Sequence, residues 1–347
     1  MRSAGVLFLI PLLVGCGQPE KKEVVEEEAM TGQLMNLGPE KLSSYNFFDG
    51  PLRDLRPSKG VHVYTINSPL FSDYAFKERM VSLPEGSSMS YQDKEPFVFP
   101  EGAVLIKNFY YPSDFGKPEG ERRLIETRLL VLREGAWQPL TYVWNDEQTE
   151  AYLEVAGRTV AVSWTQGTGV LRTIDYSIPN LNQCRGCHLK GDKVMPIGPS
   201  ARQLNVGDQL GRWSKAGLMD GLPEASIIPR LANYEDPKEP LEARARAWLE
   251  INCAHCHRPE GQGKTSGLHL MADVTSPLAL GIGKAPVAAG KGSGGRMFSI
   301  VPGAPDESIL VYRIESTDPG VMMPEMGRRL VHEEGVSLIR EWIQSMN

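Results

Sequence analysis

Two copies of one five-residue pattern constrain this chain of 347 residues more than any other feature. The first copy is Cys184-Arg185-Gly186-Cys187-His188 and the second is Cys253-Ala254-His255-Cys256-His257. Two cysteines on one tight turn can form thioethers to one edge of a porphyrin, and the histidine that follows can bind its iron. The sequence therefore predicts two covalently bound haem c groups. The predicted attachment residues are Cys184, Cys187, Cys253 and Cys256, and the predicted iron ligands are His188 and His257.

Two other uses of paired cysteines fit this pattern less well. Disulfides, within each pair or crossed between the pairs, suit an exported protein, but they give no role to the histidine after each pair. A structural zinc site usually joins Cys-X-X-Cys pairs that are closer together than the 65 residues between Cys187 and Cys253. We therefore rank haem attachment above both alternatives.

The N-terminus predicts export and lipid attachment. An apolar run over residues 4–14 follows Arg2, and it is too short to span a membrane but typical of a secretory signal peptide. The run ends at Leu13-Val14-Gly15-Cys16, which resembles the lipobox of bacterial lipoproteins, where the signal is cut before the cysteine. We expect residues 1–15 to be removed and Cys16 to carry lipid. An ordinary signal peptide is the alternative, and it leaves Cys16 as an unexplained thiol.

The predicted lipid anchor and the net charge limit where the protein can be located and which partners it can bind. A lipid on Cys16 would hold the protein on the periplasmic side of the cell envelope, and Gly17 after it favours the outer over the inner membrane. Residues 16–41 are rich in Glu and Lys and are expected to form a solvated tether. Loss of Arg2 makes the formal charge −7 instead of −6. This sign argues against nucleic acid and permits a basic redox partner, which stays unidentified.

Residues 42–180 predict an antiparallel β domain, either a sandwich or a partial barrel. Runs of β-branched and aromatic residues at 103–111 and 124–133 are separated by turn-forming residues. Glu134-Gly135 predicts a hairpin between 124–133 and 139–144, and Ala156-Gly157 predicts a second hairpin between 151–155 and 159–164.

Residues 181–236 carry the first motif, and residues 237–347 carry the second. The first segment is short for an independent cytochrome, so we expect its haem to borrow a pocket wall from the β domain. The second has the layout of a small class I cytochrome c, with an amphipathic helix before the motif, a Met-Pro loop and an amphipathic helix over 333–346. The predicted fold is therefore α+β, with an N-terminal antiparallel β domain followed by a mainly α-helical cytochrome c region that carries both haems.

Methionines before prolines are the first candidates for the sixth iron ligands. A thioether favours Fe(II), and Met323 before Pro324 matches the ligand position of class I cytochromes, with Met322 and Met326 as alternatives. Met195 before Pro196 is the corresponding candidate for the first haem, although only a nearly straight segment could carry it from His188 around the porphyrin. The other unassigned histidines are His62, His269 and His332, while His255 is expected to point away from its own haem.

Seven blocks of the chain resemble a family of exported bacterial di-haem c-type cytochromes, many of them lipoproteins. The blocks are residues 68–75, 124–131, 142–151, 182–188, 196–205, 245–257 and 316–328. The resemblance covers nearly the whole mature chain, including the β region. It implies haem c and electron transfer but no substrate. Members are often encoded beside a predicted parallel β-helix protein, which suggests a cell-surface protein partner.

Three functions remain in competition. The first is electron transfer through two haems. The second is a di-haem redox enzyme, a peroxidase or a small-molecule oxidase, whose first haem has an open sixth position. The third makes the β domain a binding module for a surface protein or glycan. Familiar di-haem peroxidases use two full cytochrome domains, so the short first segment favours a carrier over a catalyst, and the enzyme question stays open.

Replacing Met323 by Ala should open the sixth position of the second haem, because alanine offers no ligand atom. The reduced variant should bind CO, and Met326→Ala, made as the control, should not. Absorption spectra of the reduced proteins under CO measure this. A Met323→Ala protein that still fails to bind CO would assign the position to another residue.

Overall fold

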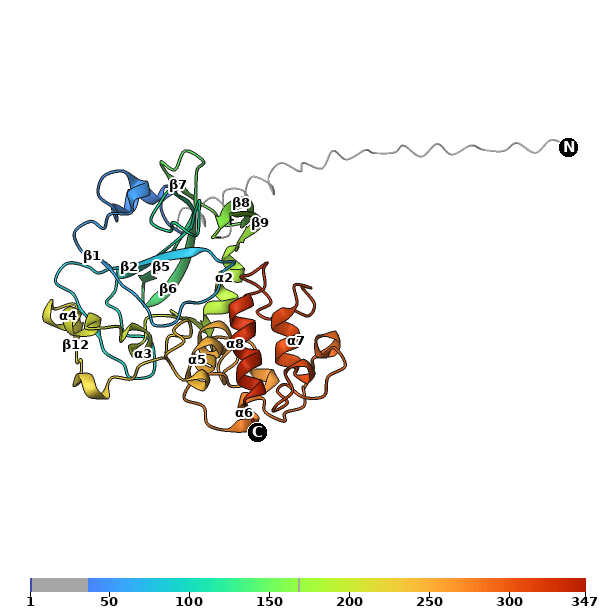
Figure 1. Ribbon diagram of the computed structural model, residues 1–347. Helices are drawn as coiled ribbons and strands as arrows, with labels where there is room; N and C mark the ends of the chain where they lie inside the picture. Colours follow the sequence, from blue (N-terminus) through green and yellow to red (C-terminus); the bar gives the residue numbers. More distant parts are fainter. Residues whose placement is uncertain (2–36, 168) are drawn as a thin grey trace. The chain divides into compact units, whose positions relative to one another are not determined.

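An antiparallel sheet of six strands forms the centre of the first half of the chain, in the order β1-β2-β4-β5-β6-β7 (Figure 1). The structure is a computed structural model, and it describes residues 1, 37–167 and 169–347. The strands are β1 (Val61–Val63), β2 (Phe76–Ser82), β4 (Val104–Pro112), β5 (Arg122–Arg133), β6 (Ala136–Trp144) and β7 (Ala151–Leu153). The predicted turn between β5 and β6 is confirmed. Glu134 and Gly135 both have positive φ, 52° and 69°, as a two-residue hairpin turn of this type requires.

Three smaller strand pairs accompany this sheet. β8 (Arg158–Gln166) pairs with β9 (Val170–Ile178), β10 (Leu189–Lys190) with β11 (Lys193–Val194), and β3 (Met89–Ser90) with β12 (Met219–Asp220). The predicted hairpin between 151–155 and 159–164 is wrong, because β7 pairs with β6 and β8 pairs with β9. The first part of β9 is exposed, so its apolar alternation is too weak to identify it as a strand from the sequence.

The residues after 180 form short helices joined by long loops. The α-helices are α2 (Leu181–His188), α3 (Ala201–Leu204), α4 (Gln209–Lys215), α5 (Leu241–Leu249), α6 (Pro277–Leu280), α7 (Ile309–Glu315) and α8 (Glu333–Gln344). A π-helical turn, Glu250–Ala254, continues α5. α5, α7 and α8 lie together (Figure 1), and the buried side chains of Trp248, Ile339 and Trp342 belong to the core they share.

The predicted mainly α-helical cytochrome region is wrong as a description of this fold. Helices account for only 24% of the described structure, and the six-stranded antiparallel sheet is its largest element. The apolar periodicity identified α5 and α8, but it could not extend them through the chain between. That chain is rich in glycine, and Gly281, Gly283 and Gly294 adopt the positive φ that ends helices.

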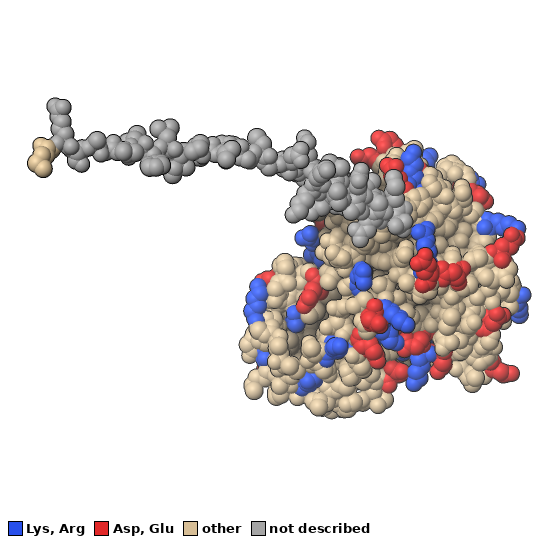
Figure 2. All heavy atoms as spheres, turned by 180° about the vertical axis from the view of Figure 1, so that it is seen from behind, with Lys and Arg blue, Asp and Glu red and all other residues tan. Residues whose placement is uncertain are grey.

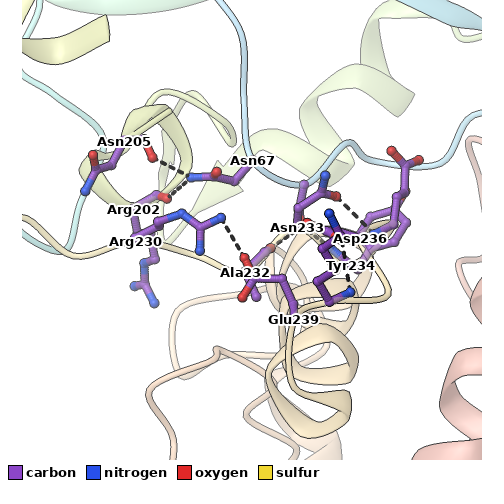
Figure 3. A network of polar contacts seen from close by, with 12 residues as sticks. Asn67, Arg202, Asn205, Arg230, Ala232, Asn233, Tyr234, Asp236 and Glu239 are labelled. Carbon is purple, nitrogen blue, oxygen red and sulfur yellow. Dashed lines mark hydrogen bonds and ion pairs between the residues drawn. The ribbon is translucent and has the colours of Figure 1, made fainter. Parts of the chain in front are cut away.

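The segment after β1 is tied to α3 and to the loop before α5 by polar contacts that are buried or partly buried. The Asn67 side chain donates to the carbonyl groups of Arg202, at 2.9 Å, and Asn205, at 3.1 Å (Figure 3). The Tyr234 hydroxyl donates to the Pro69 carbonyl at 2.7 Å. These bonds hold the β region and the later helices in one compact unit, Pro39–Asn347.

Charge is mixed on the surface of this unit. On the face drawn in Figure 2, lysines and arginines lie among aspartates and glutamates. Within the described residues, no helix is both long enough and apolar enough to cross a membrane. The predicted signal peptide, Cys16 and most of the predicted tether at 16–41 lie outside the described residues.

Replacing Ile339 by Ala should destabilise the protein by about 2–5 kcal/mol, because it leaves a cavity in the core between α5 and α8. The Ile339 side chain is 0% exposed. Leu278→Ala is the control: this side chain is 61% exposed, so the change should stay within about 0.5 kcal/mol. Urea unfolding followed by circular dichroism gives both values, and equal losses would contradict the packing described.

Candidate functional site

A cavity of about 420 Å³ lies between the six-stranded sheet and the segments that follow it, within the range usual for cofactor pockets. Its sheet wall includes Leu105, Lys107, Arg128, Leu130 and Thr141. The opposing segments contribute Cys184, Cys187, His188, Trp248, Ile251, His255, Met322, Met323 and His332. The prediction that the first motif uses a wall of the β region is consistent with this arrangement.

α2 places both cysteines of the first motif on the cavity wall. The helix begins at Asn180, whose side chain accepts from the Gln183 amide at 2.9 Å, while the Gln183 side chain accepts from the Asn180 amide at 3.0 Å. This capping box fixes the start of an eight-residue helix, so Cys184 and Cys187 lie one turn apart on the same face. Both are free thiols, and burial raises the pKa of each.

His188 ends α2 with its ring held by backbone. Its Nδ1 lies 2.8 Å from the carbonyl oxygen of Met195, and the Met195 amide donates to the His188 carbonyl at 2.8 Å. A protonated Nδ1 donating to this carbonyl leaves Nε2 as the free lone pair, the usual arrangement of a metal-binding histidine. Burial lowers the pKa of His188 to about 4, so the ring is neutral at physiological pH.

Met195 lies behind His188 and not across the cavity from it. Its carbonyl is at Nδ1, the side of the imidazole away from any metal on Nε2. Pro196, Ile197, Gly198 and Pro199 line the cavity, whereas Met195 does not. The structure therefore does not bring the Met195 side chain to the position that the sequence prediction gave it.

The second motif follows α5 through the π-helical turn. His257 Nδ1 lies 3.0 Å from the Ser266 hydroxyl, and burial lowers the pKa of His257 to about 4. This histidine thus also has one ring nitrogen engaged and is neutral. Cys253, Cys256 and His257 do not line the large cavity, but His255 does. Burial, followed by the nearby His188, lowers the pKa of His255 to about 4.

The methionine loop borders the large cavity. Met322, Met323 and Met326 all line it, and the Met323 amide donates to the Arg313 carbonyl at 3.0 Å. The charge of Arg313 also acts on His257, which does not line this cavity, so Met323 and His257 share Arg313 as a neighbour. The Met326 methyl group lies 3.3 Å from the point where a Cβ on Gly186 would stand, so this loop packs on the first motif.

A row of cations crosses the sheet inside the cavity, and sequence reasoning missed it. Arg79 pairs in register with Lys107, Lys107 with Arg128, and Arg128 with Thr141. Arg128 binds the buried carboxylate of Glu126 at 2.5 and 2.9 Å. Among the described residues, Arg79 Nη2 has no hydrogen-bond partner, and neither Arg79 nor Lys107 has a carboxylate within ion-pair distance.

We call Arg79, Lys107 and Arg128 the cation row. Placing them side by side costs folding free energy, and a bound anion would offset that cost. Like charges directly opposite one another in a sheet destabilise it, and a buried unpaired donor does so as well. Adjacent strands are about 4.8 Å apart, so the row spans about 14 Å from Thr141 to Arg79. Thr141 lies beside the Cys184 thiol. The unpaired Arg79 thus lies at the far end of the cavity from the attachment cysteine. The sequence signal was a single basic residue inside each of two largely apolar strands, Lys107 in β4 and Arg128 in β5.

The remaining histidines differ in whether they line the cavity and could therefore bind a haem iron there. His62 on β1 and His269 do not line the cavity. His332 does, but its Nδ1 accepts from Trp248 Nε1 at 2.9 Å and its ring stacks on Phe71 with centroids 4.3 Å apart. His332 is therefore fixed by packing and by a hydrogen bond.

Comparisons with protein-family models, curated proteins and solved structures found no match to this chain. Within the described residues, no group of three or more His, Cys, Asp and Glu side chains is placed to hold a metal ion.

Stability should fall as the pH drops from about 6.5 to about 4, and His332 should account for part of the loss. Burial lowers the pKa of His332 from 6.5 to about 4, so over this range the unfolded chain binds a proton that the folded chain does not. His332→Gln keeps an acceptor for Trp248 and should lower the slope of unfolding free energy against pH by up to about 1.4 kcal/mol per unit. Parallel urea titrations of both proteins measure it, and identical slopes would contradict the burial.

Proposed function

We propose that this chain is a di-haem c-type cytochrome that transfers electrons at the cell envelope. The observation that carries the proposal is the first motif's setting. Both of its thiols and a neutral His188, its Nδ1 already bonded to a carbonyl, line one cavity that is walled on the other side by a sheet. These are the donor set and the shape that a covalently attached haem needs.

The residues present fit two haem c groups. All four cysteines of the two motifs are free thiols, as thioether formation requires. His188 and His257 each have Nδ1 engaged by an oxygen, which fixes the ring orientation and leaves Nε2 for iron. Bound haem iron would supply a one-electron couple. Met323 remains the proposed sixth ligand of the second haem.

The cavity walls would set the electrostatics of the first haem. Arg79 offers an unpaired guanidinium for the propionates, and charge-assisted hydrogen bonds to carboxylates are among the stronger ones in proteins. Burial and the nearby Arg79 lower the pKa of Lys107 well below its usual value, and an anion beside it would favour its charged form. Leu105 and Leu130 occupy the adjoining row of the same sheet face and keep water from it. Positive charge near the iron favours the reduced state, and burial limits the solvent rearrangement that accompanies electron transfer.

Location and partners follow from the sequence. Cys16 is proposed to carry the lipid anchor on the periplasmic side, with the outer membrane favoured. The electron donor and acceptor are a redox partner protein that is unidentified, and a cell-surface protein is a further proposed partner. A di-haem redox enzyme with an open first haem is the competing function, and CO binding by the reduced wild-type protein distinguishes it from a carrier.

Protein made in a bacterium that attaches haem c should carry two covalent haems per chain. Cys184→Ser with Cys187→Ser should leave one haem, and Cys253→Ser with Cys256→Ser should leave the other, because each pair forms its own thioethers. Pyridine haemochrome spectra of the denatured chains give the count.

Cys16→Ser is the control for these variants. It should keep both haems but release the protein from the membrane fraction. A wild-type protein with no covalent haem, or paired serine variants that retain two, would refute the proposed function.

A further inference from the structure

We propose that His255, the residue before the second cysteine of the second motif, is the sixth ligand of the first haem. This inference rests on the proposed function, since it requires a haem on Cys184 and Cys187. It assigns a ligand that the sequence left open, and it assigns it to a residue of the other haem's attachment loop.

The position of His255 is the first observation. Its side chain is buried, with 7% exposed, and it lines the cavity that Cys184 and His188 line. The other functional residues of its own motif, Cys253, Cys256 and His257, do not line this cavity. The π-helical turn that continues α5 therefore directs His255 away from the second attachment site and into the first.

The second observation is an unused ring nitrogen. His255 Nδ1 is buried and meets no strict hydrogen-bond criterion among the described residues, although the Ile251 backbone acts on the ring, and no described contact engages Nε2. A ring whose Nδ1 faces the protein's own chain leaves Nε2 for iron, as in His188 and His257.

The two imidazoles reach the same cavity from separate parts of the chain. His188 ends α2, and the Met195 carbonyl of the turn that follows holds its Nδ1. His255 follows the π-helical turn that continues α5. Both histidines line the cavity, so a porphyrin on Cys184 and Cys187 would have a second imidazole within the same space.

Met195, His332 and Met326 are less well placed than His255, whereas Met322 and Met323 also line this cavity and are its remaining rivals. Met195 holds His188 Nδ1 through its backbone carbonyl, and Met195 does not line the cavity. His332 has Nδ1 bonded to Trp248, and its Nε2 lies 3.8 Å from the exposed Glu334 carboxylate. Met326 packs on Gly186 of the attachment helix and is 37% exposed.

A histidine in this position would also join the two haems. His255 is the chain neighbour of Cys256, whose sulfur is the proposed thioether to the second haem. One residue would then connect the first iron to the second porphyrin. Electrons could pass between the haems without leaving the protein.

His255→Ala tests the ligand directly, because Cys253-Ala-Ala-Cys-His keeps the attachment pattern. The variant should still carry two haems by pyridine haemochrome. One of them should change from low-spin to high-spin in the oxidised protein, and after reduction it should bind about one CO per chain, as expected for an open sixth position. Added imidazole should restore the low-spin spectrum, which a purely structural role for His255 would not predict.

Met195→Leu is the matched control, since it removes the rival sulfur and keeps the backbone that holds His188. It should remain low-spin and inert to CO. If His255→Ala does not accumulate, His255→Met keeps a similar volume and should change the electron paramagnetic resonance signature of one haem.

The inference would be overturned if His255→Ala kept two low-spin haems that do not bind CO, or if the electron paramagnetic resonance spectrum of His255→Met were unchanged. A high-spin haem in Met195→Leu would also overturn it. So would CO binding by the wild type. The haem count separates its failure from that of the proposed function, because a wild type without covalent haem would refute both.

Discussion

The reciprocal bonding between His188 and Met195 is the constraint on which the rest of the candidate site depends. Two backbone and ring hydrogen bonds, each 2.8 Å long, close the β10–β11 turn and fix the imidazole at the end of α2. The turn also brings Pro196 to Pro199 onto the cavity wall. Because the chain that follows His188 binds its Nδ1, the sixth ligand of a haem at this position would have to come from a distant part of the sequence.

Charge in the cavity follows a second constraint, set by the sheet register. Arg79, Lys107 and Arg128 come from three strands and stand side by side because antiparallel pairing puts them opposite one another. Glu126 satisfies only Arg128. A protein that keeps two further cations on a buried face bears a free-energy cost, and the cost is understandable if an anionic group shares the space.

The sequence predicted what depends on local pattern and missed what depends on register. The cysteine motifs, the β5–β6 hairpin, α5 and α8 could all be identified from spacing and periodicity. The fold class could not, because glycine-rich loops replaced most of the expected helix. The cation row could not be predicted either, since its members lie 28 and 21 residues apart and only pairing aligns them. His255 was expected to point away from its own haem, and sequence gave no sign of the cavity that it enters.

The enclosure of the first motif has a consequence for biogenesis. The thiols of Cys184 and Cys187 line a cavity whose walls extend from Tyr64 to Val336, so almost the entire chain must dock before it closes. If haem attaches to these cysteines as proposed, it would reach them more easily before the walls meet. We expect the maturation machinery to act on the newly exported, still open polypeptide. The second half of the protein would then complete its folding around the attached haem.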